Sequence, residues 1–166
     1  MKARHLRHLM NLWPPFLFSG IRVTALSDDW RHAQVRLRSG LLNRNYVGTH
    51  FGGSLFAMTD PFWMILVMEN LGRRDYVVWD KAGEIDFIAP ARGEIRARFD
   101  LDDAVLAQFR RACAGGDKYL HWFQTDLVDR QDRVVARVRK QIYARRKPAP
   151  ESGQAEPATD PTRVPD

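Results

Sequence analysis

The chain has 166 residues, the size of one domain, and 45% of them are hydrophobic, enough to bury a core without disulfides or a structural metal. Cys113 is the only cysteine, which excludes an intrachain disulfide and a cysteine-based zinc site and fits a cytoplasmic protein. The whole chain has a net charge of +6, and the first 146 residues carry about +8, because the last 20 have two basic and four acidic side chains.

Residues 1–19 are predicted to be a lead-in to the main domain. The segment is basic, as targeting peptides are, but Pro14 and Pro15 interrupt the apolar stretch that a secretory signal needs. It is also not rich in serine, as a transit peptide would be. A short helix over Ala3–Asn11 accounts better for this stretch, because its apolar residues then share one side.

Residues 20–146 are predicted to form the main domain, which contains six strands. Apolar and polar residues alternate with period two in several stretches, the pattern of half-buried strands. The stretch Tyr119–Val128 is apolar on both faces, so we expect it to be central or to lie at an interface. The other five predicted strands are Ile21–Ala25, Ala33–Arg38, Val77–Ile88, Ile95–Leu101 and Val134–Ile142.

One long helix, Gly53–Asn70, is predicted between the second and third strands. Its residues are apolar nearly all round, which is typical of a buried helix, and Gly72 suits the turn that ends it. Pro61 removes a helix hydrogen bond and predicts a kink near Ala57. The longest apolar stretch contains Asp60 and Pro61 and is too short to span a membrane comfortably, so we expect no membrane span.

A second helix is predicted over Asp102–Ala114, where Asp102 or Asp103 would cap it and two glycines would stop it. From Lys147 to Asp166 hydrophobic residues vanish, and a disordered tail is expected. The element order favours an α+β fold in which a six-stranded antiparallel sheet wraps around a central helix.

The segment from Asn43 to Asp60 carries the residues best suited to chemistry. Gly52 and Gly53 lie where a loop turns into the apolar helix, and the unpaired N–H groups of a helix start suit a developing oxyanion. Asp60 follows two turns later in otherwise apolar surroundings. A carboxylate there needs a cleft, an interface or a polar partner, because burying it alone is costly.

These residues resemble the motif of the hotdog-fold thioesterase superfamily. That motif reads Asn-x-x-Gly-x-x-His-Gly-Gly with an Asp seven residues beyond the last glycine. The residues here are spaced as Asn45-x-x-Gly48-x-x-Phe51-Gly52-Gly53-x6-Asp60. More closely, the segment resembles an uncharacterised thioesterase-like branch that reads Gly-Thr-x-Phe-Gly-Gly, followed by Asp-Pro.

The resemblance implies a hotdog fold over about residues 20–146 and an acyl-CoA thioesterase activity. It implies that Asp60 activates water or attacks the thioester and that the amides of Gly52 and Gly53 polarise its carbonyl. Asn45 and a histidine would position substrate or water. Phe51 occupies the histidine position and cannot exchange a proton, while His50 precedes it and is the candidate substitute. The residues expected around the substrate are Gly48, Thr49, Phe51 and Gly52.

Each candidate also has a purely structural interpretation. Asp60 could pair with an arginine or with free backbone groups, and Asn45 could stabilise a turn. His50 could be an ordinary loop histidine, and the glycines could permit close packing. The tryptophans Trp63, Trp79 and Trp122 are better explained by core or subunit contacts than by substrate binding.

The resemblance predicts the small-molecule partner, and the open edges of a single sheet predict the assembly. Coenzyme A would enter as part of the substrate, and no separate cofactor or metal ion is expected. A homodimer or a dimer of dimers is expected to pair through the Tyr76–Ile88 edge. The alternative to an enzyme is a non-catalytic protein that binds an acyl-thioester or lipid. Nucleic-acid binding would rest on the positive charge alone, and we expect none.

Overall fold

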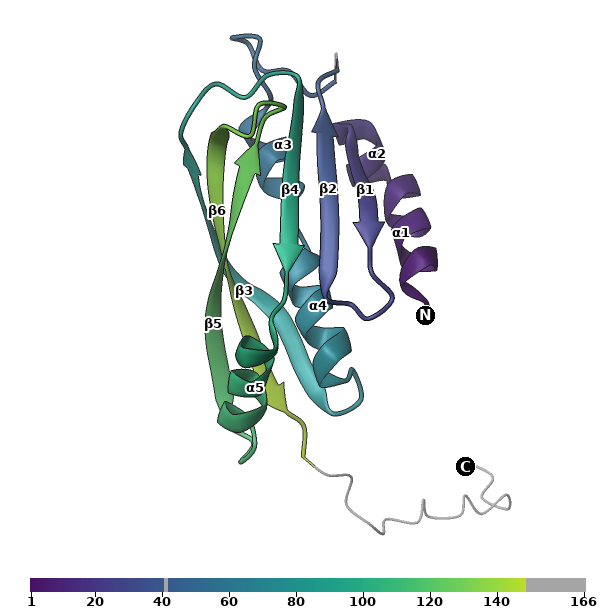
Figure 1. Cartoon of the computed structure of the whole chain (residues 1–166), viewed down its shortest axis with the longest axis vertical. Helices are drawn as coiled ribbons and strands as arrows, with labels where there is room; N and C mark the ends of the chain where they lie inside the picture. The colour runs from purple at the N-terminus through teal and green to yellow at the C-terminus, as the bar shows by residue number, and fades with distance from the viewer. Residues whose placement is uncertain (41, 149–166) are drawn as a thin grey trace, which may run out of the picture.

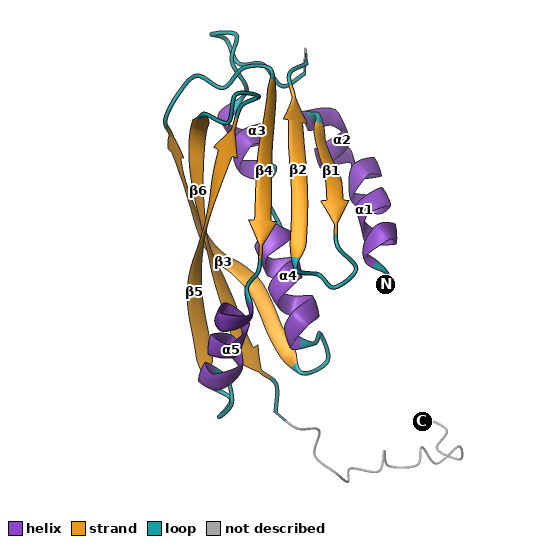
Figure 2. Cartoon of the chain, in the orientation of Figure 1, coloured by secondary structure: helices purple, strands orange, loops and turns teal. Residues whose placement is uncertain are grey.

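The computed structural model describes residues 1–40 and 42–148, so the predicted tail lies outside the described residues from position 149 onward. Six strands form one antiparallel sheet in the order β1-β2-β4-β5-β6-β3, with the helices packed around it (Figures 1 and 2). The six predicted strands are all present, and β5 is an interior strand as predicted. The strands are β1 Ile21–Leu26, β2 His32–Arg38, β3 Tyr76–Phe87, β4 Glu94–Asp100, β5 Lys118–Val128 and β6 Val134–Arg146.

The sheet consists of two well-paired halves. Strands β1, β2 and β4 form one half, and β5, β6 and β3 form the other, strongly twisted half (Figure 1). The halves join through two paired positions, Arg96 with Val128 and Ala97 with Leu127. The edge strands of the sheet are therefore β1 and β3.

The predicted helix over Gly53–Asn70 is divided into two helices, α3 (Gly52–Ala57) and α4 (Phe62–Leu71). The prediction of one continuous helix was therefore wrong, although the kink expected near Ala57 lies at the break. Pro61 has no N–H to continue the helical ladder. Instead, the Asp60 amide donates to the Ala57 carbonyl at 3.1 Å, and the connection between the helices is a turn.

Helix α4 is the central buried element of the fold. Apolar residues on all sides of it are shielded from solvent, in agreement with the sequence pattern. Phe62 stacks on Phe99 with ring centroids 4.9 Å apart, and Trp63 stacks on Phe123 at 4.2 Å. The Trp63 indole N–H donates to Thr125 Oγ1 at 2.8 Å, which satisfies a polar group that would otherwise be buried without a partner.

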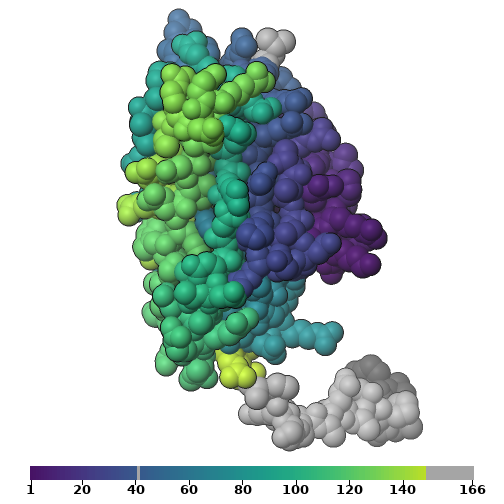
Figure 3. Space-filling model, viewed as in Figure 1, coloured from purple at the N-terminus to yellow at the C-terminus, as the bar shows by residue number. Residues whose placement is uncertain are grey.

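The N-terminal segment forms two helices, α1 (Ala3–Leu12) and α2 (Pro14–Ser19), of which only the first was predicted. Proline is favourable at a helix start, so Pro14 and Pro15 begin α2. The purple N-terminal segment lies along one side of the molecule (Figure 3). There the Asn11 side chain exchanges two hydrogen bonds with the backbone of Val23, at 2.7 and 3.1 Å. Helix α1 thus covers the β1 edge.

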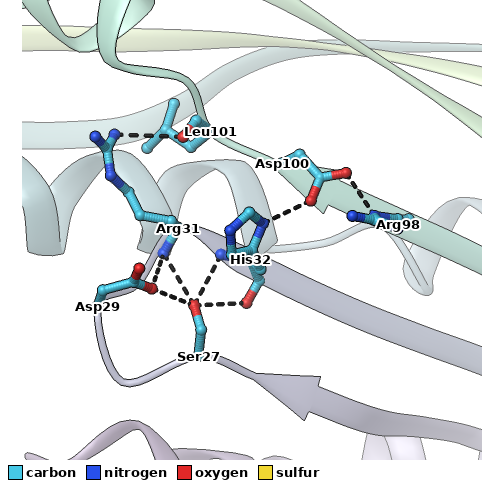
Figure 4. Close-up of polar contacts among 7 residues, drawn as sticks. All are labelled: Ser27, Asp29, Arg31, His32, Arg98, Asp100 and Leu101. Carbon is cyan, nitrogen blue, oxygen red and sulfur yellow. Dashed lines mark hydrogen bonds and ion pairs between the residues drawn. The ribbon is translucent and has the colours of Figure 1, made fainter.

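The turn from β1 to β2 is held by the polar cluster of Figure 4. Ser27 Oγ accepts from the backbone amides of Arg31 and His32, and His32 Nδ1 lies 2.6 Å from Asp100 Oδ1 on β4. Partial burial raises the pKa of Asp100, but hydrogen bonds from Arg98 and His32 outweigh that effect and leave the pKa below its usual value. These polar residues fix the hairpin and its pairing with β4.

Helix α5 (Asp103–Ala112) lies between β4 and β5, where the second helix was predicted. Asp102 caps it, since its side chain accepts from the Val105 amide at 3.0 Å. Among the described residues, no helix is both long enough and apolar enough to cross a membrane.

Candidate functional site

Two asparagines hold the loop that leads into α3. Asn43 is 3% exposed, and its side chain accepts from the Gly40 amide and donates to the carbonyls of Ser19 and Arg38. The Asn45 side chain accepts from the Thr49 amide at 3.0 Å and donates to Thr49 Oγ1 at 2.8 Å. Both asparagines therefore hold the backbone of this loop, and for Asn45 a turn-stabilising role was one of the two interpretations of the sequence.

His50 is almost completely buried. It is 2% exposed, and its Nε2 lies 2.8 Å from the Gly93 carbonyl oxygen, to which an N–H there donates. Its backbone amide donates to the Ala91 carbonyl at 3.0 Å. Nδ1 is also buried and has no hydrogen-bond partner among the described residues. His50 thus fastens the loop to the connection between β3 and β4.

The two glycines are enclosed by aromatic rings. A Cβ atom on Gly53 would collide with the Phe51 ring, and one on Gly52 would lie 2.8 Å from Cζ of Phe87. The first helical hydrogen bond of α3 runs from the Ser54 amide to the Phe51 carbonyl. The Gly52 and Gly53 amides donate to no residue that the structure describes, so both N–H groups are available to an oxygen acceptor.

A groove of about 490 Å³ runs beside this loop. Four residues predicted from the sequence contribute to its lining: Asn45, Thr49, His50 and Gly52. Leu55, Phe87 and Ile88 supply apolar walls. Asp60 is not among the lining residues, so the predicted site falls into two groups within one chain, the loop groove and the surroundings of Asp60.

Asp60 forms an ion pair with Lys140 of β6. Lys140 Nζ lies 3.0 Å from Asp60 Oδ1. The Lys140 side chain is 7% exposed and the Asp60 side chain is 47% exposed. The ammonium also lies 4.6 Å from the centre of the Phe56 ring. Gly83 of β3, which pairs with Lys140, leaves room for this arrangement, since a Cβ there would come within 2.6 Å of the Phe56 ring.

A second carboxyl, Asp80 of β3, joins the ion pair. A bulge between Asp80 and Ala82 places Asp80 opposite Ile142, so Asp80 shares the helix-facing side of the sheet with Lys140. Burial raises the pKa of Asp80 to about 6. The Lys140 charge opposes this rise, while a hydrogen bond to Asp60 and the charge of Asp60 add to it.

Neither partner of Asp60 was predicted from the sequence. The signal for Lys140 was present, because it occupies an inward position in the alternation of β6, between the buried residues Val138 and Ile142. A charged residue at such a position needs a buried partner. Asp80 gave no comparable signal, since the bulge determines its direction. No metal-binding group of three or more His, Cys, Asp or Glu side chains occurs within residues 1–40 and 42–148.

Residues 2–144 match the family model DUF4442, a domain of unknown function. The chain belongs to this family. Among curated proteins, none matches the sequence of this DUF4442 protein.

Solved structures share the fold of this DUF4442 protein. A protein of unknown function from Pseudomonas aeruginosa, named a probable thioesterase, has a TM-score of 0.78 and 24% identity over 89% of this chain and 97% of its own. A protein of unknown function from Chlorobaculum tepidum has a TM-score of 0.68 and 17% identity, covering 87% and 94%. A thioesterase from Haemophilus influenzae has a TM-score of 0.63 and 13% identity, covering 88% and 92%. At these identities the likeness confirms the predicted α+β hotdog fold.

Proposed function

We propose that the protein is a thioesterase that hydrolyses the thioester of an acyl-CoA. The observation that carries this proposal is the setting of Asp60. Its side chain is about half exposed, whereas its neighbours Met58, Thr59 and Phe62 are each at most 1% exposed. A solvent-accessible carboxylate in an otherwise apolar segment is suited to accept a proton from water. Two structural neighbours are named as a probable thioesterase and a thioesterase, which supports the general reaction class but not the acyl-CoA substrate.

The proposed reaction uses water as the nucleophile. As the water oxygen bonds to the thioester carbonyl carbon, Asp60 accepts a proton from that water. The N–H groups of Gly52 and Gly53 donate to the oxyanion of the tetrahedral intermediate. The carbon–sulfur bond then breaks, and the proton passes from Asp60 to the leaving thiolate. The products are a carboxylic acid and free coenzyme A, whose phosphates would meet the basic surface of the protein.

A complete site requires a second copy of the chain in this proposal, because Asp60 does not line the groove beside the glycines of its own chain. Strand β3 is an edge strand with mostly exposed side chains, and an unprotected edge favours pairing. Pairing through β3 would bring the loop of one copy towards Asp60 of the other.

The substitution Asp60→Asn tests the proposed reaction. It preserves size and removes the base, so kcat for acyl-CoA hydrolysis is expected to fall by about 10²–10⁴-fold while folding persists. The assay follows thiol release over a series of acyl-chain lengths, with circular dichroism as the folding control. Asp75→Asn, at an exposed position between α4 and β3, is the matched control and should keep parental activity. Parental activity in Asp60→Asn would assign Asp60 a structural role.

The second candidate function is a non-catalytic acyl-thioester or lipid binder. Two observations favour it: Phe51 occupies the family histidine position, and His50 is buried against Gly93. Calorimetric titration with acyl-CoA separates the two functions. An inactive parent that binds acyl-CoA supports the binder, whereas turnover supports the enzyme.

A further inference from the structure

Asp60 is accompanied by two ionisable groups that the proposed hydrolysis does not use. Lys140 is 6% exposed, which is rare for a lysine, and its Nζ lies 3.0 Å from Asp60 Oδ1. Asp80 is partly buried and is close enough to Asp60 to share a hydrogen bond with it. Three charged groups therefore gather at one place on the helix-facing side of the sheet.

The fold brings these groups together from three separate elements. Asp60 lies in the connection between α3 and α4, Lys140 on β6 and Asp80 on β3. The bulge in β3 aligns Asp80 with Ile142, two residues beyond Lys140 and on the same face. Gly83 and the Phe56 ring enclose the lysine stem. Strand register thus sets the positions of Asp80 and Lys140, and the ion pair with Lys140 holds the Asp60 carboxylate.

The charges of this cluster allow two states. When Asp80 holds a proton, its O–H can donate to the Asp60 carboxylate, and Asp60 and Lys140 balance each other. When Asp80 is ionised, two carboxylates share one ammonium. Burial, the Lys140 charge and Asp60 together give Asp80 a pKa of about 6.

We propose that Asp80 is a positioning residue that controls Asp60: in its protonated form it donates a hydrogen bond to the Asp60 carboxylate and occupies the lone pair needed to accept a proton from water. Lys140 anchors Asp60 in both states. This inference rests on the proposed hydrolysis. Turnover should therefore rise with pH as Asp80 ionises, and one pH unit below the midpoint about one tenth of the activity should remain.

Two substitutions of Asp80 separate this role from a structural one. The side-chain amide of Asp80→Asn donates a hydrogen bond at every pH and imitates the protonated acid, so turnover should stay low up to pH 8. Asp80→Ala donates nothing, so turnover should stay high down to pH 5, about tenfold above the parent at that pH. The readout is kcat against pH for both variants, with Asp117→Asn, at an exposed position between α5 and β5, as the matched control. Equal losses in both Asp80 variants at every pH would overturn the proposal.

Carbon-detected NMR of the aspartate carboxyls tests the cluster without relying on activity. In the parent, the Asp80 carboxyl should titrate near pH 6. Its midpoint should fall in Asp60→Asn, which removes a neighbouring negative charge, and rise in Lys140→Met, which removes the positive one. A parent protein that hydrolyses no thioester but shows these shifts would contradict the proposed function. It would still support the interaction of Asp80 with Asp60 and Lys140. An Asp80 midpoint near 4 in all three proteins would overturn the cluster itself.

Discussion

At the scale of single residues, burial distinguishes the side chains that hold the loop from those that can meet a ligand. Asn43 and His50 are both buried and bonded to backbone groups, whereas Phe51 next to them is 57% exposed. The Asp60 carboxylate is partly open to solvent, whereas the side chain of its partner Lys140 is buried. The loop therefore uses these polar side chains to hold its shape, and the Gly52 and Gly53 amides and the Asp60 carboxylate remain the candidates for the proposed chemistry.

The substitution His50→Ala is expected to lower the free energy of unfolding by about 1–3 kcal/mol, because it leaves the Gly93 carbonyl without its donor in a buried place. Urea denaturation measures this change. His5→Ala, on the N-terminal helix, is the matched control and should shift the midpoint little. A His50→Ala protein with parental stability and a selective loss of kcat would instead show that the histidine takes part in hydrolysis.

The sequence motif made Asp60 and the glycine pair candidate site residues but did not predict the partners of Asp60. Motif spacing is local along the chain, whereas Lys140 is 80 positions away from Asp60 and Asp80 depends on a bulge. The inward position of Lys140 on β6 was enough to predict a nearby carboxylate, because a buried ammonium needs an anion. The direction of Asp80 was not readable, since one extra residue in a strand reverses the face of every side chain beyond it.

At the scale of elements, all six strands were predicted. Period-two patterning indicated several of them, because each half of the sheet packs one face on the core. The same patterning could not show where the central helix is interrupted. Met58 and Phe62, on either side of the break, are buried like the apolar residues within the helices. Pro61 was the local signal for the break, and it acts through its missing N–H rather than through hydrophobicity.

The cap of α5 provides a test at this scale. Asp102→Ala removes the acceptor of the Val105 amide and is expected to destabilise the protein by about 1 kcal/mol. Asp102→Asn is the matched control, because asparagine caps helices about as well and should keep stability within a few tenths of a kcal/mol. Both values come from urea denaturation curves. Equal destabilisation in the two variants would show that the charge of Asp102 matters more than its hydrogen bond.

At the scale of the whole molecule, the two edges of the sheet differ. The β1 edge is covered by α1, whose Asn11 side chain satisfies the backbone of Val23. The β3 edge is largely exposed, and large apolar side chains lie at its end, with Phe87 at 60% and Ile88 at 53% exposure. Exposed edges with apolar residues are unfavourable in an isolated chain.

This asymmetry predicts that the protein is a homodimer, or a dimer of dimers, paired through β3. Sedimentation velocity at micromolar concentration should show no monomer for the parent chain. Phe87→Lys places a charge at the predicted interface and should shift the protein towards monomer, because burying an unpaired ammonium is costly. Leu9→Lys, on α1 and 56% exposed, is the matched control and should leave the assembly intact. A monomeric parent protein would contradict the proposal that a second copy completes the site. Asp60 and the glycine amides would then have to act from opposite ends of α3 in a single chain.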